Sequence, residues 1–162
     1  FRKLATTPMT PFEWLLARML WFLFISMVTL AVVMGFGMLV FGMNMTLNPA
    51  ALLIVVSASA MFSALGMIIA RFVKNEETAS AAANAITFPM MFLSGTFFQL
   101  ETMPAYLQQV ASVLPLTYVS QGLRDAMVYD NLDGAYWNLA VVAVIAVVFV
   151  IVAVLVTKWE EE

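Results

Sequence analysis

Residues that carry out covalent or metal chemistry are scarce in this chain. The sequence contains no His and no Cys, which excludes imidazole and thiolate metal sites, a Cys nucleophile and a Ser–His pair. A serine nucleophile would need a lysine base, but Lys3, Lys74 and Lys158 all fall outside the long apolar runs of the sequence. We therefore expect no metal site, no bound cofactor and no catalytic residue on this chain.

Nucleotide and proton-transfer motifs are also missing from the sequence. There is no G-x-x-x-x-G-K-[ST] loop to bind a nucleotide phosphate, and no basic patch that would favour nucleic acid. No paired carboxylates lie within the apolar runs, which argues against an intramembrane aspartyl protease or a proton relay. The chain is not expected to be an enzyme or to bind nucleic acid.

Four long apolar runs fill most of the sequence instead. Of the 162 residues, 64% are apolar and 10% are charged, against about 45–50% and 25% in a soluble domain. Each run has about 20 residues or more, which lets a helix cross a hydrocarbon layer of about 30 Å. Continuous rather than alternating apolar sequence favours helices over barrel strands. We predict an all-α polytopic membrane protein with transmembrane helices over residues 19–43, 50–70, 78–98 and 139–157.

The positions of the basic residues predict the orientation of these spans. With a cytoplasmic N-terminus, Arg124 alone of the seven basic residues lies outside. We therefore predict a multi-pass protein of the plasma membrane with both ends of this fragment in the cytoplasm. Because the chain starts with Phe1 rather than Met, we also expect upstream sequence. The six basic residues expected inside are Arg2, Lys3, Arg18, Arg71, Lys74 and Lys158.

Residues 1–18 are predicted to form a cytoplasmic segment that ends in a helix. Thr10 suits the N-cap position, Pro11 suits the first helical position, and Glu13 completes a capping box. A helix should therefore begin at Pro11 and continue toward the first span. Taken alone, this pattern indicates only a well-capped membrane helix.

Small and polar residues in the second and third spans allow two interpretations. Ser59, Ser63 and Gly66 recur at helical spacing, which lets another helix approach closely. Ser57, Ser59 and Ser63 could instead line a polar path, although packing is favoured. In the third span, Pro89 should kink the helix, and its polar residues could bond a neighbouring helix or line a transport path.

Residues 99–138 fit neither a span nor an ordinary loop. Pro104 opens one short segment, Pro115 ends it, and residues 116–129 form a second segment that is amphipathic. Both segments are too short to cross a bilayer, so we predict two outer re-entrant or interfacial helices. The apolar face of the second segment comprises Leu116, Val119, Leu123 and Met127.

Three stretches of the sequence resemble the C-terminal part of the type-2 permeases of ABC transporters. The likeness covers nearly the whole chain, and its third stretch is the most specific. These stretches are Leu4–Leu16, Ala64–Glu77, and the series Phe88–Phe98, Met103-Pro104, Leu114–Tyr118 and Leu123-Arg124.

The resemblance implies a six-span permease, of which two spans would precede this chain. Two copies, identical or different, would pair in the membrane, and each would dock on a separate ATP-binding cassette subunit that holds ATP and magnesium. Closure of those subunits would push on a coupling helix and turn the spans from inward-facing to outward-facing. The coupling residues implied by the resemblance are Thr10, Pro11, Phe12, Glu13, Trp14 and Arg18. The implied outer gate comprises Tyr106, Tyr118, Gln121, Arg124 and Asp125.

We expect the third span to line the cavity between the paired permeases. Met and Phe give an apolar wall that adapts to irregular shapes, although the same residues could simply face lipid. A hydrophobic or amphipathic substrate, such as a drug or a lipid, is favoured. A polysaccharide exporter and an ATP-independent channel or assembly subunit stay open as alternatives. The candidate lining residues are Asn84, Thr87, Met91, Phe92 and Ser94.

Overall fold

The computed structural model describes residues 11–42, 46–73, 75–98 and 100–156. Every regular element in these ranges is a helix, so the predicted all-α fold is confirmed. The elements in chain order are α1 (Pro11–Phe41), α2 (Pro49–Phe72), α3 (Glu76–Leu93), the 3-10 helix η2 (Leu100–Thr102), α4 (Ala105–Ala111), α5 (Pro115–Met127) and α6 (Leu132–Val156).

Three of the described helices are long and apolar enough to cross a membrane: Leu16–Phe41 within α1, and the whole of α2 and α6. The α6 helix starts at Leu132, seven residues before the predicted span, because Asp133 and Asn138 interrupt the apolar sequence without ending the helix. The predicted limits at Met43 and Thr157 lie outside the described residues.

The third predicted span, residues 78–98, corresponds to the 18-residue helix α3, about 27 Å long at 1.5 Å per residue. This helix ends at Leu93, and Gly95 follows in the left-handed region with φ of 79°, a conformation that suits glycine. Residues 94–98 therefore do not extend the helix. That α3 crosses the membrane stays a prediction.

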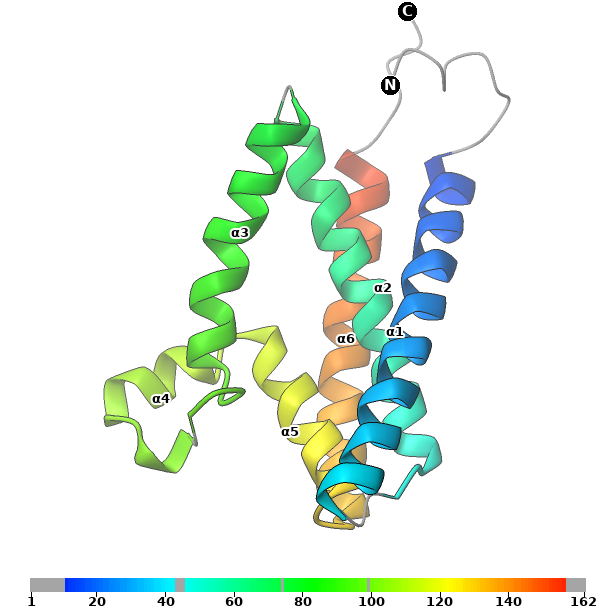
Figure 1. The fold of residues 1–162 in the computed structure, drawn as a ribbon. Coiled ribbons are helices and arrows are strands. Elements are labelled where there is room, and N and C mark those ends of the chain that lie inside the picture. The colour runs from blue at the N-terminus through cyan, green and yellow to red at the C-terminus, as the bar shows by residue number, and fades with distance from the viewer. Residues whose placement is uncertain (1–10, 43–45, 74, 99, 157–162) are drawn as a thin grey trace, which may run out of the picture.

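The helices are arranged around α2, which packs against α1, α5 and α6 (Figure 1). The start of α1, the α2–α3 turn and the end of α6 lie together at one end of the molecule, which we call the Arg71 end. The α1–α2 connection and the α5–α6 turn lie at the opposite end, which we call the Asn48 end. The α3 helix diverges from α2, and α5 runs obliquely from the end of α3 to the Asn48 end (Figure 1).

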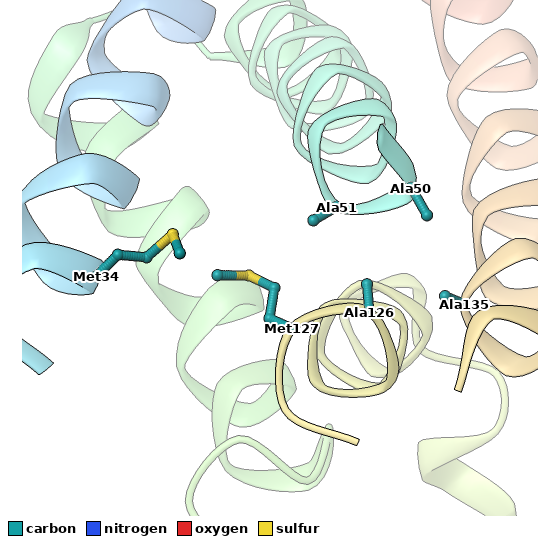
Figure 2. Close-up of a cluster of buried hydrophobic side chains, with 6 residues drawn as sticks. All are labelled: Met34, Ala50, Ala51, Ala126, Met127 and Ala135. Carbon is teal, nitrogen blue, oxygen red and sulfur yellow. The ribbon is translucent and has the colours of Figure 1, made fainter. Parts of the chain in front are cut away.

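Close packing at the Asn48 end depends on alanine and methionine. Figure 2 shows Met34 of α1 and Met127 of α5 pointing toward each other, with alanines of α2, α5 and α6 beside them. Alanine leaves room for helices to approach closely, and methionine fills the irregular space that remains. We call this group the alanine–methionine cluster; it comprises Met34, Ala50, Ala51, Ala126, Met127 and Ala135.

The predicted small-residue contact on α2 is formed only in part. Ser59 is buried, but Gly66 is exposed, and a Cβ atom added to it would meet nothing within 4 Å. The close contacts of α2 instead use Ala50, Ala51 and Ala64, which are fully buried.

Candidate functional site

The amphipathic helix α5 is the element on which the site is built. Pro115 occupies the first turn of α5, where a missing backbone N–H costs nothing. The apolar face of α5 packs against the other helices. Val119 and Met127 are buried, while Leu116 and Leu123 pack against the core. This confirms the apolar face predicted from the sequence.

Gly122 brings α5 into close contact with two longer helices. A Cβ atom at this position would lie 2.9 Å from Ile54 Cδ1 of α2 and 3.0 Å from Asn138 Cβ of α6. A small side chain would require Ile54 to change its rotamer and Asn138 to shift slightly, and a larger one would push α5 away from α2 and α6. The position of α5 depends on this glycine.

Two side chains of α5 bind the backbone that follows α3. The Ser120 hydroxyl donates to the Ser94 carbonyl oxygen at 2.9 Å, and Arg124 Nη2 donates to the Gly95 carbonyl oxygen at 3.0 Å. The last carbonyls of a helix lack partners within the helix, and a cation there is favourable. We call these four residues the α3 clamp; it fixes the end of α3 to α5.

Asp125 and Asn138 join α5 to α6. Asn138 Nδ2 donates to Asp125 Oδ2 at 3.2 Å and to the Gly134 carbonyl at 3.0 Å. The backbone N–H of Asn131 also donates to the backbone carbonyl of Asp125 at 2.9 Å. Asn138 is 6% exposed and was not predicted from the sequence to be a functional residue. The signal in the sequence was a side-chain amide, that of Asn138, directly before the apolar run 139–157.

The α1–α2 connection holds the C-terminal end of α5. Asn48 Nδ2 donates to the Ala126 carbonyl at 2.6 Å, while Asn48 Oδ1 accepts from the Ala51 amide at 3.1 Å and so caps α2. The Thr46 amide donates to the Met127 carbonyl at 3.2 Å. Neither residue was predicted from the sequence, although Asn48 followed by Pro49 before an apolar run is a helix-start signal.

A pocket of about 380 Å³ lies beside the α3 clamp. It brings together three of the predicted outer-gate residues, Gln121, Arg124 and Asp125, with one predicted pathway residue, Ser94. Its wall carries charges of both signs. The complete lining is Ser94, Gly95, Leu100, Glu101, Ser120, Gln121, Arg124, Asp125 and Tyr129.

The other two predicted outer-gate residues lie outside this pocket. The Tyr118 hydroxyl donates to the Ser112 carbonyl at 2.7 Å and so fixes the corner between α4 and α5. Tyr106 lies on α4 and is 66% exposed. A gating role for these residues stays a prediction.

Four of the predicted pathway residues lie on α3 and Ser94 directly follows it, and their environments differ. Asn84, Thr87 and Phe92 are exposed, Met91 is half-buried, and Ser94 is fully buried at the clamp. The Phe92 ring stacks on Phe97, with ring centroids 5.2 Å apart. Whether this face of α3 lines a transport pathway stays a prediction.

The predicted coupling segment forms the start of α1 at the Arg71 end. The helix begins at Pro11, and Glu13 and Arg18 are exposed. Thr10 and the side chains of Phe12 and Trp14 lie outside the described part of the chain. At the same end, Arg71 Nε donates to the Val156 carbonyl at 3.2 Å and joins α2 to α6. A role of these residues in coupling stays a prediction.

Comparison with known proteins places the chain in a family. Residues 2–155 match the model of the ABC-2 family transporter protein. The probable multidrug ABC transporter permease YbhS of Escherichia coli K12 is 28% identical over 151 residues, which cover 91% of this chain and 38% of that protein. Nodulation protein J of Rhizobium leguminosarum bv. viciae is 26% identical over 87 residues, which cover 54% of this chain and 34% of that protein.

The match is to part of a longer architecture, because this chain spans about 38% of the length of the first of these relatives. No solved structure matches the chain. The helical fold, the three membrane-capable helices and the family match over nearly all residues agree with one another. The chain therefore belongs to the ABC-2 family of transporter proteins.

Proposed function

We propose that this chain is the membrane part of a permease subunit of an ATP-driven exporter for a hydrophobic or amphipathic substrate. A family match over residues 2–155 carries this proposal, and a relative named as a probable multidrug permease supports the substrate class. ATP and magnesium would bind to a separate ATP-binding cassette subunit. Two permease copies, identical or different, would form the translocation unit in the lipid membrane.

The coupling step of the proposal uses α1 as one continuous rod. This helix has 31 residues and is about 46 Å long, so its start and its Met34 contact with α5 lie near opposite ends of the molecule. A push on the segment around Glu13 would reach the alanine–methionine cluster without crossing a hinge. From there, α5 and the α3 clamp would move the end of α3.

Reconstitution tests this function directly. The full permease, purified with a candidate ATP-binding cassette subunit and placed in lipid vesicles, should transport a lipophilic cationic dye only when ATP and magnesium are present. Glu13→Ala should lower this transport at least about five-fold, the low end of a coupling free energy of 1–3 kcal/mol. The permease–ATPase complex should still form, as measured by co-purification.

Glu77→Ala is the matched control, because Glu77 is also an exposed acid in the first turn of a helix at the Arg71 end. It should leave transport unchanged. Dye movement that is equal without ATP would contradict the exporter and favour a channel. Full transport by Glu13→Ala would reduce the role of Glu13 to a helix cap.

We propose that the Arg71 end faces the cytoplasm, because Arg18 and Arg71 both lie there. The other four residues of the predicted inner set lie outside the described residues. In a permease without other cysteines, Val113→Cys should react with a membrane-impermeant maleimide in intact cells, since Val113 is 79% exposed near the corner between α4 and α5. Glu77→Cys should react only after permeabilisation. The reverse pattern would contradict this orientation.

A further inference from the structure

The pocket of about 380 Å³ beside the α3 clamp, which we call the polar pocket, carries opposite charges that do not pair with each other. Its wall includes the Arg124 guanidinium and the carboxylates of Glu101 and Asp125. Among the described residues, Arg124 bonds the Gly95 carbonyl and forms no ion pair with either carboxylate. The volume lies within the range of about 300–1,000 Å³ that is typical of small-molecule pockets. The polar pocket therefore has room for a ligand that meets groups of both signs.

Several polar groups in the wall of the polar pocket keep bonding capacity for a ligand. Arg124 uses one N–H of Nη2, whereas a guanidinium has five N–H donors. The Asp125 carboxylate accepts from Asn138 at Oδ2, which leaves Oδ1 available. A ligand can therefore bind without breaking the contacts that hold α5. Three further side chains of the wall have no hydrogen-bond partner among the described residues: those of Glu101, Gln121 and Tyr129.

The signs of the wall charges select a zwitterion. An anion that reaches Arg124 also meets two carboxylates, and a cation that reaches the carboxylates also meets Arg124. A ligand with one group of each sign avoids both conflicts. A guanidinium binds phosphate through paired N–H donors, and a primary ammonium donates three hydrogen bonds to oxygen atoms. A quaternary ammonium is bound by a cage of aromatic rings, whereas Tyr129 is the one aromatic residue in this lining.

The lengths of two helices place the polar pocket near one surface of the membrane. The α3 helix starts and the α6 helix ends at the Arg71 end (Figure 1). Ser94 follows the 18 residues of α3, about 27 Å from that end. Asn138, which bonds Asp125, lies 18 residues before Val156, again about 27 Å away. Because the hydrocarbon layer is about 30 Å thick, the polar pocket lies where the headgroups of the leaflet opposite the Arg71 end begin.

We propose that the polar pocket holds the headgroup of a zwitterionic phospholipid that has a primary amine, such as phosphatidylethanolamine. The phosphate binds Arg124, and the ammonium donates to Glu101 and Asp125. The acyl chains lie against the exposed rings of Phe97 and Phe98, which follow the clamp in sequence. The lipid is a resident ligand and not the transported substrate, so binding needs neither ATP nor the ATPase subunit. Failure of this proposal would leave the exporter proposal untouched.

Nanodiscs of phosphatidylcholine with a rising fraction of phosphatidylethanolamine test binding to the full permease. Amide hydrogen exchange in residues 94–104 should slow and then reach a plateau as phosphatidylethanolamine is added. Phosphatidylglycerol, which has no amine, should need at least an about ten-fold higher fraction for half of this effect, the loss expected for one hydrogen bond between charged groups. Exchange that is the same with all three lipids would overturn the proposal.

A carbodiimide locates the amine, because it joins a primary amine to a carboxylate as an amide. Coupling of phosphatidylethanolamine to Glu101 or Asp125 should saturate at the same lipid fraction as the hydrogen exchange. Any coupling to Asp133, an exposed acid of α6 outside the polar pocket, should rise in proportion to the lipid fraction. Water-soluble glycerophosphoethanolamine should not reproduce the protection at equal concentration. Equal protection by this soluble headgroup would overturn the assignment to a lipid.

Two variants separate lipid recognition from folding. Glu101→Lys gives the wall two cations and one carboxylate, so it should reverse the preference and favour phosphatidylglycerol. Asp133→Lys is the matched control and should keep the preference of the parent permease. Gln121→Trp places an indole ring in the polar pocket and should abolish the saturable protection. All three proteins must keep the elution profile of the parent. The proposal is overturned if Glu101→Lys still prefers phosphatidylethanolamine, or if Gln121→Trp shows parental protection.

Discussion

Replacing Gly122 with leucine should destabilise the permease and displace α5 from the bundle. A Cβ atom at position 122 already lies 2.9 Å from Ile54 Cδ1 and 3.0 Å from Asn138 Cβ, so a larger side chain must force the helices apart. Overpacking of this kind costs about 1–3 kcal/mol. We expect a clearly lower melting temperature in detergent and faster proteolysis at the α5–α6 turn.

Gly66→Leu is the matched control for this prediction. Gly66 is also in the interior of a helix, but a Cβ atom there would meet nothing within 4 Å. Leucine also has a higher helix propensity than glycine, by about 0.5–1 kcal/mol. The control should therefore melt at or above the temperature of the parent. Equal losses in both variants would show that Gly122 has no special packing role.

Removing the Arg124 side chain should free the backbone that follows α3 and impair transport. In Arg124→Ala, the Gly95 carbonyl loses its charged donor at 3.0 Å. A hydrogen bond to a charged group contributes about 1.5–3 kcal/mol, and the lower value applies because Arg124 is only half-buried. Amide hydrogen exchange in residues 94–104 should then rise about ten-fold, and ATP-dependent dye transport should fall.

Arg71→Ala gives the comparison for Arg124, because Arg71 also donates to a carbonyl at the end of a helix, that of Val156. Its loss should leave hydrogen exchange in residues 94–104 unchanged, since it acts at the Arg71 end. An Arg124→Ala protein with parental exchange in residues 94–104 would contradict the α3 clamp. If Arg124→Ala transports the dye at the rate of the parent permease, Arg124 has no role in gating.

The sequence predicted the helices better than their contacts. Apolar runs of about 20 residues require helices in a membrane, so α1, α2 and α6 could be recognised from length and composition. The apolar face of α5 was also correct, because periodic spacing fixes which side chains share a face. Helix ends were less certain: α3 ends at Leu93, and the carbonyls of Ser94 and Gly95 beyond it bond α5 instead.

The polar bonds between distant segments could not be predicted from one sequence. Asn48 bonds a carbonyl 78 residues away, and Arg124 bonds one 29 residues away. No local pattern specifies such a pair, because any carbonyl in reach can accept. The sequence showed that Arg124 and Asp125 are polar residues on an amphipathic helix, but their partners depend on how α3, α5 and α6 meet in space.

The hydrogen bonds that join α5 to its neighbours end mainly on main-chain oxygen atoms, those of Ser94, Gly95 and Ala126. Every residue type supplies such an oxygen, so the accepting residues can be substituted during evolution without loss of these hydrogen bonds, as long as the local backbone conformation is kept. Paired substitutions should therefore be rare across these contacts. Methods that infer proximity from correlated changes in aligned sequences will then underestimate how firmly α5 is attached.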